Sequence, residues 1–150
     1  MKYLVIVALF FVSAQAALDP KIISEFMEKV TKFGEKCMGE TKATSEDVSQ
    51  IMAHKIPDSH EGKCMISCVY KAFKIQNEDG TMNSDETLKL MERIKESDAE
   101  LYENLIKVFK ICHGKPELIV ADPCLTAVNV GTCAVTEGKA LGIKSELFGM

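Results

Sequence analysis

Apolar residues recur at helical spacing through most of this chain, and no segment shows convincing strand alternation. The clearest example lies within residues 62–75, where Met65, Val69 and Phe73 form one stripe. Residues three or four positions apart share one face of a helix, so this pattern predicts an amphipathic helix. The same periodicity elsewhere predicts an all-α fold with about six helices.

Residues that favour helix ends give approximate bounds for these helices. Asp19-Pro20 and Asp122-Pro123 each place a good N-cap residue before proline at the first helical position. We expect Gly39 to terminate the first helix and Ser97 to start the fifth through a capping box. The expected helices run from residue 20 to 37, from 44 to 54, from 60 to 76, from 83 or 84 past 94, from 97 to 114 and from 122 to 137.

The first sixteen residues have the pattern of a cleaved secretory signal. Lys2 precedes an apolar run at 3–12, and Ala14 and Ala16 supply small residues before the expected cleavage point. The run is short for a bilayer span, which makes a membrane anchor or a buried N-terminal helix the less favoured interpretation. We therefore expect a secreted protein with a signal peptide at 1–16 and one domain at 17–150.

Charge and composition limit the partners of this domain. The formal net charge is −4, and no basic patch interrupts the sequence. A mildly acidic domain of this kind is a poor candidate for binding nucleic acid or an anionic membrane. No further segment is long and apolar enough for stable membrane insertion.

Six cysteines follow the signal segment, an even number that indicates a disulfide framework in a secreted protein. Cys64 and Cys68 lie one helical turn apart and would share a face. They could pair with each other, or each could reach a different distant segment; spacing alone does not choose. Zinc binding is less expected on a secretory route, and the turn at 77–83 lacks the alternating acidic residues of a calcium loop. No metal site and no cofactor are expected.

The cysteine spacing resembles that of the insect odorant-binding protein family, the pheromone and general odorant-binding proteins. Twenty-six, three, 43, 11 and eight residues separate successive cysteines, and the gaps of three and eight are the most specific. The Asp79-Gly80 turn before an acidic helix start is also similar. The resemblance covers essentially the whole chain after the signal, and it implies the pairs Cys37–Cys68, Cys64–Cys124 and Cys112–Cys133.

The resemblance further implies helices around an internal hydrophobic cavity, held by three interlocked disulfides. By this resemblance, the protein would be a soluble carrier that binds odorants, pheromones or similar semiochemicals non-covalently and delivers them through aqueous fluid. Its expected partners are a small hydrophobic ligand and a chemosensory receptor, and its expected state is a monomer or weak homodimer. The candidate lining residues are apolar side chains predicted to point inward, together with one from the tail: Phe26, Met27, Val30, Met65, Val69, Phe73, Leu88, Met91, Ile94, Leu105, Phe109, Val128 and Phe148.

Polar groups and the C-terminal tail give three further expectations. Tyr70 and Tyr102 could offer a hydroxyl to a ligand oxygen, although an amphipathic surface position is the commoner role of tyrosine. The apolar C-terminal tail either folds over or into the cavity or is a frayed terminus. The tail residues that could enter the cavity are Leu141, Ile143, Leu147 and Phe148. Three histidines suggest release of ligand in acid: His54, His60 and His113.

Two other classes of protein compete with the carrier. A saposin-like, lipid-interacting helical protein also has six cysteines, but its series begins with a two-residue gap that this chain lacks. A secreted helical signalling protein would act through its surface. An enzyme is not expected, because none of the histidines lies in a motif with a nucleophile.

Overall fold

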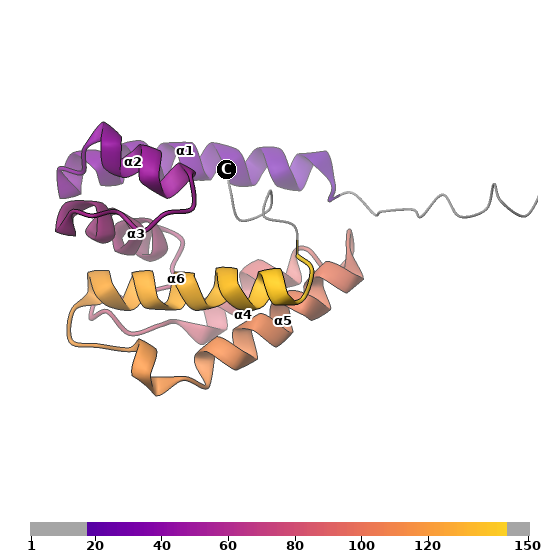
Figure 1. The fold of residues 1–150 in the computed structure, drawn as a ribbon. Helices are drawn as coiled ribbons and strands as arrows, with labels where there is room; N and C mark the ends of the chain where they lie inside the picture. The colour runs from indigo at the N-terminus through magenta and orange to yellow at the C-terminus, as the bar shows by residue number, and fades with distance from the viewer. Residues whose placement is uncertain (1–17, 144–150) are drawn as a thin grey trace, which may run out of the picture.

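The computed structural model describes residues 18–143 as six α-helices and one short 3-10 helix (Figure 1). Within these residues there is no strand beyond an isolated bridge between Gln76 and Met82. The all-α prediction is therefore confirmed. The elements are α1 (Pro20–Thr41), α2 (Ser45–Met52), α3 (His60–Ala72), α4 (Ser84–Glu92), α5 (Ala99–His113), η2 (Pro116–Leu118) and α6 (Pro123–Ala140).

The predicted starts of the first and last helices are confirmed by their cap hydrogen bonds. The Asp19 carboxylate accepts from the backbone N–H of Lys21 at 2.8 Å. The Asp122 carboxylate likewise accepts from the backbone N–H of Cys124 at 2.8 Å. Each aspartate satisfies an N–H that the first turn of a helix leaves without a partner.

Two predicted helix ends are wrong. Gly39 does not terminate α1, which continues to Thr41 and ends where Lys42 turns into the left-handed region at φ 60°. Ser97 does not cap α5 and lies in the preceding turn, where its backbone N–H, like that of Asp98, donates to the Ile94 carbonyl. Asp98 caps α5 instead, and its carboxylate accepts from the Leu101 N–H at 2.9 Å.

The bounds of the other helices differ from prediction by a few residues. α2 ends two residues early and α3 four residues early, each before a residue with positive φ, His54 and Lys74 respectively. α4 stops at Glu92, and α6 continues three residues past Glu137. These ends depend on turn conformations that apolar periodicity does not report.

The centre of the fold is the pair formed by α3 and α6. α1 and α2 pack on α3, whereas α5 packs on α6 and α4 packs on α5. In Figure 1, α1, α2 and α3 accordingly lie on one side of α6, and α4 and α5 lie on the other. No helix within residues 18–143 is long and apolar enough to cross a membrane.

Three disulfides reinforce this arrangement. Cys37–Cys68 joins α1 to α3, Cys64–Cys124 joins α3 to α6, and Cys112–Cys133 joins α5 to α6. These are the pairs that the family resemblance implies. Cys64 and Cys68 thus bind α3 to two different helices. In the chain-entropy model, closing loops of this size contributes roughly 3–4 kcal/mol per bond.

The buried side chain of Gln76 fixes the α3–α4 connection onto the start of α6. Ser67 Oγ donates to Gln76 Oε1 at 2.6 Å, and Gln76 Nε2 donates to the carbonyls of Gly80 and Pro123 at 2.9 and 3.0 Å. Gly80 has φ 89°, and a Cβ there would lie 2.9 Å from the Pro123 ring. Glycine is therefore required both by the backbone conformation and by the close approach of α6.

Candidate ligand-binding site

The hydrophobic core of the described residues is divided into two clusters. We name the first the α5–α6 cluster; its buried members are Leu101, Val108, Cys112, Cys133 and Ile143. We name the second the α1–α3 cluster; its buried members are Cys37, Ala43 and Met65. Apolar side chains outside the two clusters range from buried, as Ala127 and Val128 are, to partly exposed.

A group of incompletely packed aromatic side chains lies where α1 faces the end of α3. The Phe73 ring lies 5.0 Å from the Phe33 ring, edge to face, and 5.4 Å from the Phe26 ring. Phe33 and Phe73 are partly buried, and Phe26 is 42 % exposed. None of the three belongs to either core cluster. They form an apolar surface that retains capacity for further contacts.

The same end of α1 also reaches the residue that follows α4. Arg93 Nη2 donates to Glu25 Oε2 at 2.6 Å, next to Phe26 in the sequence. Both side chains are more than 40 % exposed, so the pair contributes little stability. It connects the end of α4 to the N-terminal half of α1.

Tyr70, one turn before Phe73 on α3, brings a polar group to the interface with α6. Desolvation by surrounding protein raises the pKa of its phenol. No hydrogen-bond partner for Tyr70 Oη is present within residues 18–143, although every fully buried polar side-chain atom in that range has one. The Tyr70 hydroxyl is therefore a candidate hydrogen-bond donor to a ligand at this interface.

Tyr102, the other tyrosine considered as a ligand contact, has a different environment. Its hydroxyl donates to Glu92 Oε2 at 2.8 Å, and Lys95 Nζ lies 5.2 Å from its ring centre. The hydrogen bond to Glu92 is the main cause of the raised pKa of the Tyr102 phenol. This hydroxyl already has a protein partner, so we retain Tyr70 alone as a polar ligand contact.

The structure distributes the predicted lining residues over three environments. Met65 and Val128 are buried, and Val69, Ile94 and Leu105 pack against the core clusters. Phe109 is partly buried and stacks on His113 with ring centres 5.3 Å apart. The remaining described candidates are partly or largely exposed: Phe26, Met27, Val30, Phe73, Leu88 and Met91. Phe148 lies outside the described residues, so its predicted role stays a prediction.

The described part of the C-terminal tail packs on protein. Ile143 is a buried member of the α5–α6 cluster, and Leu141 packs against that cluster. Gly142 between them has φ 75°, which turns the chain back after α6. The other tail residues considered in the sequence, Leu147 and Phe148, lie outside the described residues.

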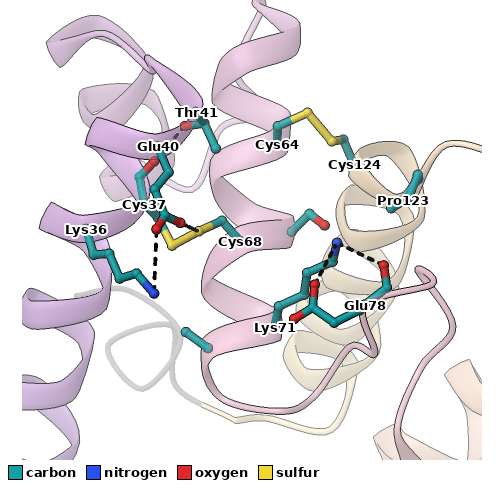
Figure 2. Close-up of a pocket in the computed structure, with 12 residues that line it drawn as sticks. Lys36, Cys37, Glu40, Thr41, Cys64, Cys68, Lys71, Glu78, Pro123 and Cys124 are labelled. Carbon is teal, nitrogen blue, oxygen red and sulfur yellow. Dashed lines mark hydrogen bonds and ion pairs between the residues drawn. A yellow bond between two sulfur atoms is a disulfide. The ribbon is translucent and has the colours of Figure 1, made fainter.

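Two open clefts, each of about 410 Å³, also mark the surface. One lies between η2 and α6 and includes Ile56, Leu118 and the predicted residue Val128. The other lies between α1, α3 and the start of α6 and is lined by two disulfides and by charged side chains such as Lys36 and Glu40 (Figure 2). This second cleft contains none of the predicted lining residues.

Some of these positions were absent from the prediction. Phe33 lies seven residues after Phe26 on the same helical stripe, so periodicity could have included it. Ile56 and Leu118 lie in the α2–α3 connection and in η2. No helical period extends to such connections, and no signal in the sequence indicates that they approach α6.

A compact all-helical domain with a divided core and three disulfides defines a class of small disulfide-linked helical proteins. The comparisons identify the family within that class. Residues 21–137 match the PBP/GOBP family. The chain is 31 % identical over 121 residues to general odorant-binding protein 19d of Drosophila melanogaster, which covers 79 % of this chain and 78 % of that protein. The chain therefore belongs to the PBP/GOBP family.

Two further comparisons agree with this assignment. General odorant-binding protein 28a of Drosophila melanogaster is 24 % identical over 140 residues, which covers 93 % of this chain and 94 % of that protein. The solved structure of odorant-binding protein dmelOBP28a from the same species superposes with a TM-score of 0.69 at 23 % identity, covering 80 % of this chain and 98 % of the other. At that identity the structure establishes the fold.

Proposed function

We propose that this protein is a secreted carrier that binds a small hydrophobic molecule non-covalently and delivers it through aqueous fluid. Membership of the PBP/GOBP family and the names of its relatives support this role. The class of ligand would be an odorant, a pheromone or a similar semiochemical. The segment at 1–16 would direct secretion and then be removed, leaving the domain at 17–150.

The structural observation that carries the proposal is the partly exposed aromatic group. Phe33 on α1 and Phe73 at the end of α3 are only partly buried and contact each other, with Tyr70 one turn away on α3. A small apolar guest would complete their contacts, with a gain of about 25 cal/mol for each Å² of apolar surface removed from water. The disulfides would keep the helices in place when the guest is absent, offsetting the packing that an interior space lacks.

The aromatic group on α1 and α3 gives the sharpest test. The mature domain would be titrated with an apolar fluorescent probe, and small apolar compounds would be used to displace it. Phe73→Ala removes the ring that contacts both Phe26 and Phe33, and we expect it to weaken binding about five- to thirtyfold. Ile111→Ala, at an exposed apolar position on α5, is the matched control and is expected to leave binding unchanged.

Helix content by circular dichroism would show that both variants remain folded. Failure of the unmodified domain to bind any probe saturably would contradict the carrier role. Leakage of dye from liposomes would instead support the saposin-like alternative. The family match favours the carrier over that alternative, and mass spectrometry of molecules that co-purify with the domain would identify its natural ligand.

A further inference from the structure

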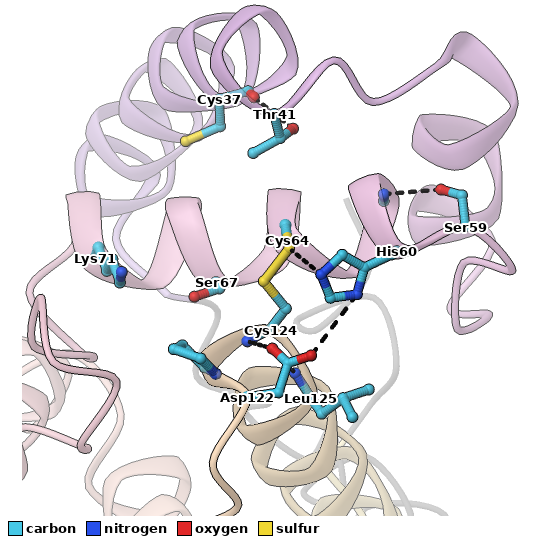
Figure 3. Close-up of a disulfide and its surroundings, with 12 residues drawn as sticks. Cys37, Thr41, Ser59, His60, Cys64, Ser67, Lys71, Asp122, Cys124 and Leu125 are labelled. Atoms are coloured by element: carbon cyan, nitrogen blue, oxygen red, sulfur yellow. Dashed lines mark hydrogen bonds and ion pairs between the residues drawn. A yellow bond between two sulfur atoms is a disulfide. The ribbon is translucent and has the colours of Figure 1, made fainter.

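The disulfide between Cys64 and Cys124 has an imidazole beside it, whereas Lys115 Nζ lies 3.9 Å from Cys133 Sγ and Glu40 Oε2 lies 3.5 Å from Cys68 Sγ at the other two. His60 Nε2 lies 3.4 Å from Cys64 Sγ, and His60 Nδ1 lies 3.7 Å from Asp122 Oδ2 (Figure 3). Carboxylate, imidazole and sulfur therefore follow one another in a row. The same order of groups activates thiols elsewhere, because the imidazole stabilises the thiolate and the carboxylate orients the imidazole.

Access distinguishes this disulfide as well. Cys37 is 0 % exposed, and Cys112 and Cys133 are 6 % and 9 % exposed, so each of the other two disulfides has at least one buried cysteine. Cys64 and Cys124 are both partly exposed. Both line the open cleft between α1, α3 and the start of α6, which Cys37 and Cys68 also line (Figure 2). A small thiol can therefore approach this bond without local unfolding.

We propose that Cys64–Cys124 is a site of thiol–disulfide exchange with small-molecule thiols such as glutathione. The thiolate of the small molecule attacks Cys124 Sγ, and a new S–S bond forms while the Cys64–Cys124 bond breaks. The electron pair of the broken bond remains on Cys64 Sγ, which takes the Nε2 proton of protonated His60. The products are a mixed disulfide on Cys124, a thiol at Cys64 and a neutral His60, with no net oxidation or reduction.

The direction of attack follows from the neighbours of each sulfur. Exchange is faster when the leaving sulfur is the better-stabilised thiolate, and His60 provides that stabilisation at Cys64. The start of α6 also favours a thiolate at Cys124. The Asp122 carboxylate, which accepts the Cys124 N–H at 2.8 Å, offsets that effect with its own negative charge. Cys64 is therefore the leaving group and Cys124 the modified residue.

This bond is also the covalent connection between the two halves of the fold. Cys37–Cys68 holds the half that contains the α1–α3 cluster, and Cys112–Cys133 holds the half that contains the α5–α6 cluster. Only Cys64–Cys124 joins α3 to α6. Exchange at this site would leave each half cross-linked within itself while removing the covalent constraint on their contact.

The test is a time course of the folded domain with excess glutathione at fixed neutral pH. Acid stops the exchange, and peptide mapping by mass spectrometry locates mixed disulfides and free thiols. We expect glutathione first on Cys124 with Cys64 free. His60→Gln removes the proton donor from an exposed position and should slow this step about three- to tenfold. Asp122→Asn keeps a capping side chain for α6 and should slow it less.

His113→Gln is the matched control, because His113 follows Cys112 directly yet stacks on Phe109, and its rate should equal that of the unmodified domain. Three results would overturn the proposal: earlier opening of either other disulfide, glutathione on Cys64 in place of Cys124, or an unchanged rate in His60→Gln. Circular dichroism before each time course establishes that the variants are folded, so that a faster rate through unfolding is recognised.

Discussion

The hydroxyl of Tyr70 on α3 lies directly against the backbone of Gly131 on α6. A Cβ atom at position 131 would come within 2.8 Å of Tyr70 Oη, whereas the next nearest atom of the ring would be 3.8 Å away. Gly131 therefore allows the Tyr70 side chain to approach α6 closely, at a position where glycine otherwise disfavours a helix. The contact is made by one oxygen atom, which makes its consequences separable by mutation.

The effect of Gly131→Ala on the free energy of unfolding should accordingly have opposite signs with tyrosine and with phenylalanine at position 70. With Tyr70 present, we expect the steric conflict to exceed the helix-propensity gain and to lower the free energy of unfolding by up to about 2 kcal/mol. In a Tyr70→Phe background, the same change should raise it by about 1 kcal/mol. Urea unfolding of the four proteins measures both effects.

Gly39→Ala is the control for this cycle, because nothing lies within 4 Å of a Cβ at position 39. It should stabilise α1 by about 1 kcal/mol whatever residue occupies position 70. Equal effects of Gly131→Ala in the two backgrounds would show that Tyr70 Oη does not restrict position 131.

Tyr70→Phe should also change ligand preference if the proposed carrier role is correct. Because the Tyr70 hydroxyl has no partner among the described residues, a ligand alcohol or carbonyl oxygen can accept its hydrogen bond. Loss of such a bond should weaken binding of an oxygen-bearing ligand about two- to tenfold. Binding of the corresponding hydrocarbon should be unchanged. Tyr102→Phe, which removes a hydroxyl already bonded to Glu92, should affect neither ligand.

Asp47 should contribute to loss of stability in acid. Ser59 Oγ donates to its carboxylate at 2.5 Å, Thr44 donates through its backbone N–H and hydroxyl, and these bonds hold the pKa of Asp47 below its ordinary value. A group with a lowered pKa in the folded state stabilises the fold above its unfolded pKa, which is about 3.9 for aspartate. That stabilisation is lost as the pH falls from about 5 through the folded-state pKa.

Asp47→Asn should therefore be less stable than the unmodified domain at pH 7 and should lose less stability between pH 5 and pH 3. Thermal unfolding at pH 7 and from pH 5 to pH 3 measures both differences. Glu46→Gln removes the same charge from the exposed neighbouring position in α2 and should change neither. A parallel pH profile for Asp47→Asn and the unmodified domain would exclude a contribution from this carboxylate.

Gln76→Glu should destabilise the connection between α3 and α6. The change preserves shape but replaces the donor to the Gly80 and Pro123 carbonyls with an acceptor, and it does so in a side chain that is 2 % exposed. Leaving buried carbonyls unsatisfied beside a buried acid should cost about 2–4 kcal/mol in the free energy of unfolding. Asn77→Asp makes the equivalent change at the exposed adjacent residue, and a comparable cost there would contradict a specific role for Gln76.

Local signals in the sequence were sufficient to predict where the two helices that begin with aspartate and proline start. They were insufficient at Ser97 and Asp98, because both residues can cap a helix and local sequence does not show that the Asp98 carboxylate meets the Leu101 N–H. The resemblance in cysteine spacing implied the covalent framework, which local periodicity alone left open.

The candidate site was harder to predict for a physical reason. An amphipathic stripe shows which side chains point inward, but it does not distinguish a fully packed position such as Met65 from an incompletely packed one such as Phe73. That difference depends on contacts between α1, α3 and α6, far apart in the sequence. The same limit applies to Tyr70 and Gly131, whose contact no local pattern indicates.

Three contacts hold the first turn of α6. The Gly80 backbone lies against the Pro123 ring, Gln76 Nε2 donates to the Pro123 carbonyl, and Cys124 is bonded to Cys64. Amide protons at this end of the helix should consequently exchange with deuterated solvent only in rare, large-scale openings. The N-terminal half of α1, fastened by an exposed ion pair and a few aromatic contacts, should exchange much sooner. The domain would therefore open for a guest at α1 while the start of α6 stays closed.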